Sequence, residues 1–150
     1  MPLEFFPAGG EAEWLRSCCW SKAFRPRFSE TDALGHVSNV SYTAYIEIAR
    51  LDFFNELGDP HREHPHFGFM HNAAEIAMRF IRPCFYDEAL AVHTRVARLG
   101  TSSAILEHAI TTEGAPDVRT IARVAIVSVK DDRSTPWNDA QRLLLAPLVR

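Results

Sequence analysis

Residues 27–57 read RFSETDALGHVSNVSYTAYIEIARLDFFNEL, and here a polar turn passes directly into a long helical pattern. Residues 29–39 are rich in turn formers, and Ser38 or Asn39 can cap a helix that follows them. Residues 40–57 form the only long helical pattern in the chain. The apolar side chains that recur there at helical spacing are Ala44, Tyr45, Ile48 and Leu51. Because this apolar stripe is wide, we expect a helix that is mostly buried.

Four later segments alternate apolar and polar side chains with the period of two that is typical of β-strands. These segments are residues 74–80, 90–96, 104–110 and 120–126. Short turns join them, which favours hairpins and an antiparallel sheet. Residues 20–28 predict one further strand, and Pro26 places it at an edge or at a bulge. The sequence therefore predicts an α+β fold in which a curved antiparallel sheet of about five strands wraps around one long central helix.

The length of 150 residues fits one domain, which we expect to span residues 20–150. Residues 1–19 predict a poorly ordered lead-in that includes a short helix near residues 11–16, and residues 138–145 predict a short C-terminal helix. The net charge of -3 argues against a nucleic-acid partner. The three cysteines form no disulfide pattern, and neither a signal peptide nor a membrane span is evident. We therefore expect a cytoplasmic protein without a membrane partner.

The turn that precedes the helix has two interpretations. It can be a solvated loop that ends in an N-cap, which is the ordinary role of such residues. It can also carry chemistry, because Gly35 allows a sharp turn and the first helical turn leaves free N–H groups with partial positive charge. Such groups can stabilise an oxygen that becomes negative during acyl transfer. The Asp32 carboxylate can then attack the acyl carbon or activate water to do so.

This turn resembles the early motif of the hotdog-fold acyl-CoA thioesterases, the 4-hydroxybenzoyl-CoA thioesterase-like superfamily. That motif is an Asp, two residues, a Gly and often a His, with an Asn and a Tyr soon after. The matching residues are Asp32, Gly35, His36, Asn39 and Tyr42. Residues 80–88 resemble the strand end and turn of the family, and residues 98–103 its next hairpin, so the likeness covers residues 27–132. Two departures are Ser38, where many relatives have a first Asn, and the Asp-Glu at 87–88, where many have Gly-Asp.

The resemblance implies that Asp32 is the nucleophile or the general base of thioester hydrolysis. It also implies that the backbone N–H of Asn39 polarises the thioester carbonyl, and it leaves covalent attack and activated water as alternatives. His36 can orient Asp32, help place water or hydrogen-bond the turn. The residues expected near the substrate or its coenzyme A part are Gly35, Tyr42, Arg82, Gly100, Thr101, Ser102 and Ser103. Arg98 is an alternative to Arg82 as the contact to a phosphate.

The family builds its site between two subunits, so the resemblance implies a homodimer or homotetramer that binds acyl-CoA at a subunit interface. Coenzyme A is then part of the substrate, and no separate cofactor is expected. The alternatives are a thioesterase for acyl carrier protein and a non-catalytic module that binds acyl thioesters. Hydration of an enoyl thioester is disfavoured, because relatives of that kind use an Asp and His pair on the central helix and residues 40–57 contain no His. The identity of the acyl group stays open.

Other candidate residues have simpler explanations. Four histidines lie close together in the sequence: His61, His64, His66 and His71. They lack a fixed helical spacing and a cysteine partner, which disfavours a zinc site. Cys84 has no basic partner in any motif and is expected to be a buried small apolar residue. Glu47 is expected to pair with Arg50 or to contact a neighbouring subunit, and a second acid of the site is the weaker interpretation.

Overall fold

The structure is a computed structural model that describes residues 10–58 and 70–150. Its helices are α1 (Glu11–Arg16), α2 (Asn39–Leu57) and α3 (Asp139–Leu145), with the short 3-10 helices η1 (Phe28–Glu30) and η2 (Ala146–Leu148). Its strands are β1 (Trp20–Phe24), β2 (His71–Phe80), β3 (Leu90–Leu99), β4 (Ser103–Thr112), β5 (Val118–Lys130) and β6 (Arg133–Ser134). Within the described ranges, no helix is long and apolar enough to cross a membrane.

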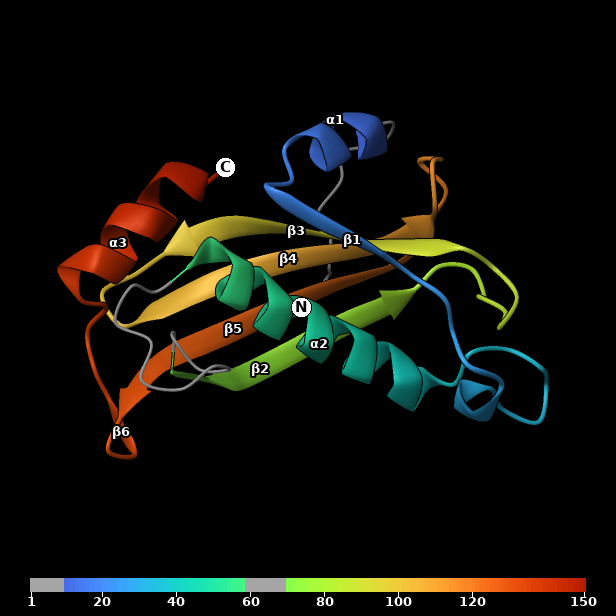
Figure 1. Cartoon of the computed structure of the whole chain (residues 1–150), viewed down its shortest axis with the longest axis horizontal. Helices are drawn as coiled ribbons and strands as arrows, with labels where there is room; N and C mark the ends of the chain where they lie inside the picture. Colours follow the sequence, from blue (N-terminus) through green and yellow to red (C-terminus); the bar gives the residue numbers. More distant parts are fainter. Residues whose placement is uncertain (1–9, 59–69) are drawn as a thin grey trace.

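The strands form one antiparallel sheet in the order β1-β3-β4-β5-β2, and the two-residue β6 pairs only with β5. Figure 1 shows α2 lying along one face of this sheet. The helix predicted at residues 40–57 is α2, and the four alternating segments lie in β2, β3, β4 and β5. The predicted α+β arrangement of one long helix against a curved antiparallel sheet is confirmed.

The core lies between α2 and the three central strands. On the helix, one stripe of side chains is buried: Tyr42, Tyr45, Ile46, Ala49, Arg50, Phe53 and Phe54. Strands β3, β4 and β5 present every second side chain to that stripe, so that Leu90, Leu106 and Ile126 are fully buried. Burial of each such side chain contributes about 1.5–3 kcal/mol to folding. This packing fixes α2, and with it the position of the helix N-terminus.

Apolar side chains also occur on the side of α2 that faces away from the sheet. Val40 is 80% exposed and Ile48 is 55% exposed. The sequence predicts Ala44 and Ile48 in the buried stripe, and this detail is wrong, because the stripe that meets the sheet runs through Ile46 and Phe53. The helix therefore presents apolar surface in two directions, which explains why its stripe is wide in the sequence.

The opposite face of the sheet is covered in part by α1. Trp14 is nearly buried there, and its Nε1–H donates to the Glu107 carboxylate over 3.3 Å. Arg95 and Arg123 pair with the same carboxylate, each at 2.7 Å, so the charge of this buried acid is compensated. The short helix expected in the lead-in is α1, and this part of the lead-in packs on the sheet because Trp14 buries its ring. Residues 1–9 lie outside the described residues.

The two edge strands differ in length and exposure. β1 has 5 residues and ends at Phe24, so its predicted edge position is confirmed while its predicted end at residue 28 is wrong. Pro26 has no N–H with which to continue the ladder, and the chain turns into η1 instead. β2 has 10 residues and forms the other edge. Most of its side chains are exposed, including those of Ile76 and Phe80.

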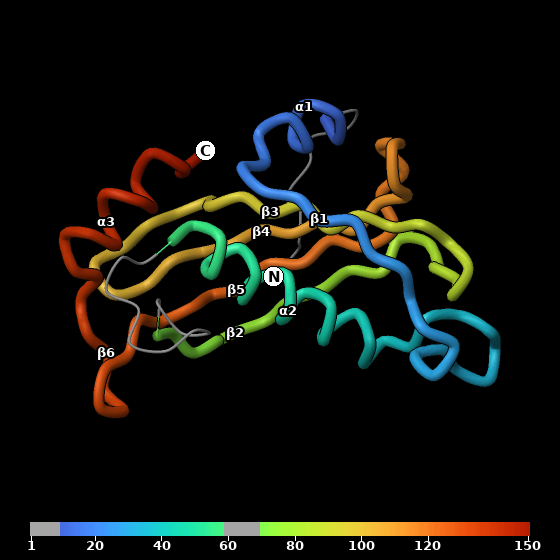
Figure 2. Tube along the Cα trace, viewed as in Figure 1, coloured from blue at the N-terminus to red at the C-terminus, as the bar shows by residue number. Residues whose placement is uncertain are grey.

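The connections between elements gather at two ends of the sheet (Figure 2). At one end, the chain between β1 and α2 lies beside the connection from β2 to β3, where the Val37 N–H donates to Cys84 O over 2.8 Å. At the other end, α3 packs beside the turn between β3 and β4, where the Arg142 side chain donates to Gly100 O over 3.0 Å. The predicted C-terminal helix is α3, which Asn138 caps. Any site at the start of α2 therefore lies at the first of these two ends.

Candidate active site

Residues 31–37, the Asp32 loop, form a small hairpin ahead of α2. One antiparallel bridge closes its base. The Asp32 N–H donates to His36 O over 2.8 Å, and the Gly35 N–H donates to Asp32 O over 3.0 Å. Gly35 has a φ of 78°, which glycine adopts at little steric cost. The predicted sharp turn at Gly35 is therefore confirmed.

The Asp32 carboxylate is held by its own loop through one oxygen. Oδ1 accepts from the Leu34 N–H at 2.9 Å and from the His36 N–H at 3.3 Å. Oδ2 has no hydrogen-bond donor in the described parts of the chain, and the residue is exposed. The loop thus orients the carboxylate while leaving one oxygen open to a ligand or water.

The start of α2 supplies unpaired N–H groups close to this loop. Ser38 is the N-cap, and its Oγ accepts from the Ser41 N–H at 3.4 Å. Asn39 is the first helical residue, so of the two predicted caps Ser38 is the one used. Among residues 10–58 and 70–150, no acceptor pairs with the backbone N–H of Asn39 or Val40. These exposed donors carry the positive end of the helix dipole and can face a negative oxygen.

Cys84 fastens the Asp32 loop and α2 together. Its carbonyl accepts from the Val37 N–H at 2.8 Å, and its own N–H donates to the Tyr42 hydroxyl at 3.0 Å. Burial is the main cause that raises the pKa of Tyr42 above its ordinary value. The sequence predicts Tyr42 as a substrate contact, whereas its burial and its bond to Cys84 favour a structural role. The predicted burial of Cys84 is confirmed, but its part in the site was missed because its contacts are made by the backbone.

One aromatic contact involves the Asp32 loop itself, and a second joins η1 to the β2–β3 connection. The His36 ring packs edge-on against Phe85 with centroids 5.3 Å apart, and Phe28 packs against Tyr86 at 5.6 Å. Of these, Phe28 is 75% exposed and Tyr86 is 50% exposed. The His36 backbone rather than its ring contacts Asp32. These aromatic contacts were missed by sequence reasoning, although the Phe-Tyr pair at 85–86 in a turn was a signal for them.

Two other charged candidates pair with neighbours. The Arg82 guanidinium lies 2.7 Å from the Asp117 carboxylate, and 59% of its side chain is exposed, so it keeps room for a phosphate. Glu47 pairs with Arg50 at 3.8 Å, which confirms the predicted partner. Glu47 is exposed on α2, and its partner Arg50 lies three residues further along the same helix. Among the described residues, neither side chain hydrogen-bonds to the Asp32 loop.

The predicted coenzyme A contacts at 100–103 lie at the other end of the sheet (Figure 1). The 10 residues of β3 separate this turn from the β2–β3 connection that carries Cys84. Backbone bonds hold the turn, with Ser128 N–H donating to Ser102 O at 2.7 Å and Trp137 N–H to Thr101 O at 3.0 Å. Within one protomer, the structure therefore does not bring residues 100–103 and Asp32 together.

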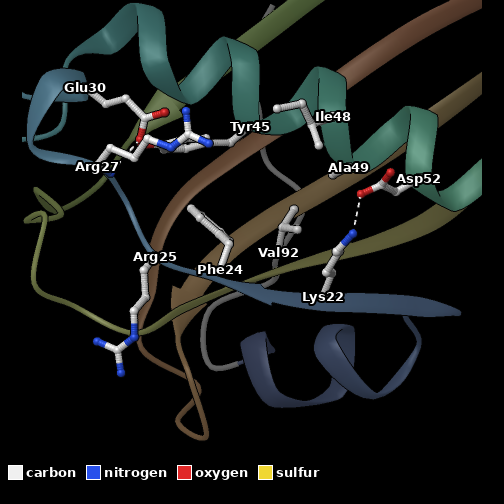
Figure 3. A pocket seen from close by; sticks show the side chains of 10 residues that line it. All are labelled: Lys22, Phe24, Arg25, Arg27, Glu30, Tyr45, Ile48, Ala49, Asp52 and Val92. Carbon is white, nitrogen blue, oxygen red and sulfur yellow. Dashed lines mark hydrogen bonds and ion pairs between the residues drawn. The ribbon is translucent and has the colours of Figure 1, made fainter.

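A cavity of about 250 Å³ lies between β1 and α2 (Figure 3). Its lining is Lys22, Phe24, Arg25, Arg27, Glu30, Tyr45, Ile48, Ala49, Asp52 and Val92, and it does not include Asp32. The Tyr45 hydroxyl donates to Glu30 at 2.6 Å, and the Arg27 N–H donates to the same carboxylate at 2.7 Å. Burial acts to raise the pKa of Glu30, but these two donors hold that pKa below its ordinary value. The cavity was not predicted, because its walls come together only in the folded chain.

The histidine cluster lies mostly outside the described residues, which leave out residues 59–69. His71 is described, and its ring packs against Phe54 with centroids 4.6 Å apart. Across the two described ranges, no group of three or more His, Cys, Asp or Glu residues could hold a metal ion. The described part of the site therefore consists of a carboxylate, backbone donors and the aromatic contact of His36 with Phe85.

Comparisons with known proteins place this geometry in a family. Residues 26–145 match the family model described as the thioesterase-like superfamily. The chain is also 26% identical over 131 residues to the uncharacterized protein YsmA of Bacillus subtilis (strain 168), a match that covers 87% of each protein. The family match therefore spans the Asp32 loop, α2 and most of the main sheet.

Two solved structures are similar to the chain over most of its length. One is a thioesterase complexed with coenzyme A and Zn from Thermus thermophilus, with 27% identity and a TM-score of 0.73 over 85% of this chain and 92% of that chain. The other is BH1999 gentisyl-coenzyme A thioesterase, with 25% identity and a TM-score of 0.73 over 85% of this chain and 99% of that chain. The predicted hotdog fold is confirmed by these similarities.

Proposed function

The chain belongs to the thioesterase-like superfamily and is a thioester hydrolase, and from that premise we propose that it hydrolyses acyl-CoA with Asp32 as the reacting carboxylate. The observation that carries this proposal is the Asp32 loop itself. One carboxylate oxygen is fixed by two backbone N–H groups, and the other has no hydrogen-bond donor among the described residues, in the loop that leads directly into α2. Coenzyme A in the Thermus relative supports a CoA thioester as substrate.

Two routes through Asp32 give the same products. In the covalent route, Oδ2 attacks the thioester carbonyl, the C–S bond breaks and CoA leaves as thiolate; water then hydrolyses the acyl–aspartyl anhydride. In the other route, Asp32 accepts a proton from a water that attacks the carbonyl, and the thiolate leaves from the tetrahedral intermediate. The Asn39 N–H stabilises the carbonyl oxygen in both. His36 contributes its backbone N–H to the orientation of the carboxylate.

We further propose that two copies form the complete site. Within the described residues, the 10-residue β2 pairs on one side only, with β5, and it exposes Ile76 and Phe80, which makes its other edge suited to pairing with a second β2. The turn at 100–103 is far from Asp32 in one protomer, so we assign its expected contact with coenzyme A to the partner of the protomer that supplies Asp32. Arg82 is the proposed phosphate contact. CoA enters as part of the substrate, and the proposed steps use no other cofactor.

The competing functions stay within the same chemistry of thioesters. A thioesterase for acyl carrier protein would use the same carboxylate with a protein-bound pantetheine. A binding module would hold acyl-CoA without cleaving it, and the open Oδ2 of Asp32 favours hydrolysis over that role. The three free cysteines, Cys18, Cys19 and Cys84, fit the reducing cytoplasm in which we place the reaction.

The decisive experiment measures thiol release from a panel of acyl-CoAs by wild type, Asp32→Asn and Asp139→Asn. Asp32→Asn should lower kcat by about 10²–10⁴-fold, because an amide is neither a nucleophile nor a base here. Asp139→Asn makes the same change at an exposed residue of α3 and should leave kcat unaltered. Equal rates for wild type and Asp32→Asn would remove Asp32 from the mechanism. Tight binding of intact acyl-CoA without turnover would establish the binding module.

A further inference from the structure

We propose that Arg119 and Glu88 are positioning residues that set the Asp32 loop against the N-terminus of α2, acting through Cys84. This inference rests on the proposed function of Asp32 and gives a role to two residues: Glu88, at the end of the family-like segment 80–88, and Arg119, which lies in none of the motifs. Arg119 belongs to β5, and Glu88 belongs to the β2–β3 connection, residues 81–89. Neither contacts Asp32 directly.

Cys84 is the point through which the effect passes. Its carbonyl holds Val37 at the end of the Asp32 loop, and its N–H holds the hydroxyl of Tyr42 in the first turns of α2. Any shift of Cys84 therefore changes the position of the loop relative to the helix. Cys84 is fully buried in a connection without regular structure, so other groups must fix its place.

Arg119 fixes the residues on both sides of Cys84. Its Nη1–H donates to Pro83 O at 2.6 Å, directly before Cys84. Its Nη2–H donates to Glu88 Oε1 at 2.8 Å, and Nη1 donates to Oε2 at 3.2 Å. Glu88 Oε2 in turn accepts from the Phe85 N–H at 2.9 Å, directly after Cys84. A two-pronged arginine–carboxylate pair has fixed geometry, which is what a positioning role needs.

The arginine itself is held from a third side and shielded from water. Its Nε–H donates to Asp117 at 2.7 Å, and only 13% of its side chain is exposed, against 23% for Glu88. Burial acts to lower the pKa of Arg119, but the hydrogen bonds to Asp117 and Glu88 outweigh it and raise the pKa. The Arg119 carbonyl also accepts from the N–H groups of Ile81 and Arg82, at 2.8 and 3.1 Å. The start of the connection is thus tied to the same residue.

The test compares Arg119→Met with Arg123→Met. Arg123 lies on the same strand and also pairs with a carboxylate at 2.7 Å, but that carboxylate is Glu107, which bonds Trp14 of α1 and, among the described residues, makes no hydrogen bond to Cys84 or its neighbours. Arg119→Met should lower kcat for acyl-CoA by about 10-fold or more with KM changed less than about twofold, because a displacement near 1 Å can cost a reacting group up to about 10²-fold. Arg123→Met should keep the wild-type kcat, even if it lowers the Tm as much as Arg119→Met does. Arg119→Lys keeps the charge and should recover part of kcat.

Amide hydrogen exchange supplies the readout that does not depend on turnover. The Val37 N–H should exchange faster in Arg119→Met than in Arg123→Met, because its acceptor is Cys84 O. Unchanged Val37 exchange in Arg119→Met, or equal kcat in the two variants at matched Tm, would overturn the positioning role. If wild type hydrolyses no thioester, the proposed function fails, and the Val37 exchange still decides whether Arg119 positions the loop.

Discussion

The two flanks of helix α2 differ in how many of their polar side chains find a partner within the same chain. The β1 flank consists of Tyr45, Asp52 and Glu56, which contact η1 or β1. The β2 flank consists of Thr43, Glu47, Arg50 and Phe54, on the side of the helix that contacts β2. Both flanks contain charged side chains, but those on the β1 flank have partners on β1, whereas those on the β2 flank have none on β2 among the described residues.

On the β1 flank, each acid finds a donor on the edge strand. Asp52 pairs with Lys22 at 2.6 Å, and Glu56 accepts from the indole N–H of Trp20 at 2.6 Å. Figure 3 shows the Lys22 and Asp52 side chains meeting across the cavity. The short β1 strand is thus tied to the helix by polar contacts, and this flank is complete within one chain.

On the β2 flank, the charged side chains have few partners among the described residues. Arg50 is 5% exposed, and in the described part of the chain its Nε and Nη1 have no hydrogen-bond partner. Its ion pair with Glu47 is long, at 3.8 Å, and Ile76 and Phe80 on the β2 strand are exposed. A buried cation without full compensation destabilises a fold. This difference favours the β2 flank as the contact surface of the proposed dimer.

The largest expected effect is on assembly and comes from Ile76→Glu on β2, compared with Ala23→Glu on β1. In a symmetric dimer the substitution enters the interface twice, so Ile76→Glu should weaken association by about 4 kcal/mol, or roughly 1000-fold in Kd. Ala23→Glu places the same charge on the other edge strand and should leave association unchanged. Analytical ultracentrifugation measures both, with thermal unfolding as the control for folding. A dimer of unaltered Kd in Ile76→Glu would contradict the assignment of the two edges.

The next effect is a pH dependence under the β2 flank. Burial, and then the charge of Arg50, lower the pKa of His108 to about 3. The folded state therefore keeps His108 neutral, whereas the unfolded chain binds a proton near pH 6.5. Stability is lost as pH falls from about 6.5 towards 3, by roughly 3 kcal/mol between pH 7 and 4.

The variant His108→Gln removes that titration and can still pair with Thr94, which bonds His108 at 2.9 Å. Urea unfolding at pH 7, 5 and 4 should show a smaller loss of stability in the variant than in wild type. The carboxylates titrate equally in both proteins, so their contribution cancels when the two losses of stability are subtracted. The same pH slope in the two proteins would rule out a neutral buried His108.

The smallest effect belongs to the β1 flank. Lys22→Met breaks the ion pair with Asp52, but 52% of the lysine side chain and 28% of the aspartate side chain are exposed. Exposed pairs contribute little, so the loss of unfolding free energy should be less than about 1 kcal/mol. Denaturant unfolding at low and high salt checks the value. A loss of unfolding free energy well above about 1 kcal/mol would contradict the view that this exposed ion pair contributes little to the β1 flank.

Local sequence patterns predicted the elements of the fold well. The helix expected at 40–57 spans Asn39–Leu57, and the turn at Gly35 has the expected shape. Both are decided by residues close together in the chain, namely turn formers, a cap and a helical period. The end of β1 was misplaced because Pro26 competes with an alternating pattern, and the lack of an N–H is the stronger influence.

The support of the candidate site could not be predicted in the same way. Cys84 holds Tyr42 across 42 positions of sequence, and Arg119 holds Pro83 across 36. These bonds use backbone atoms, so the residue types give no signal. The unpaired guanidinium nitrogens of Arg50 in the described part of the chain were equally hidden, because a Glu-x-x-Arg spacing on a helix predicts a satisfied surface pair.

The strand order has a consequence for how the chain is made. β1, α2 and β2 precede the other strands in the sequence, yet within the described residues β1 pairs only with β3, and β2 pairs only with β5. The hairpins β3–β4 and β4–β5 close locally, whereas the two N-terminal strands must dock on opposite edges of a sheet that is synthesised after them. On the ribosome, the Asp32 loop therefore stays without its anchors until Arg119 has emerged. The end of the molecule that carries Asp32 is encoded early and assembled late.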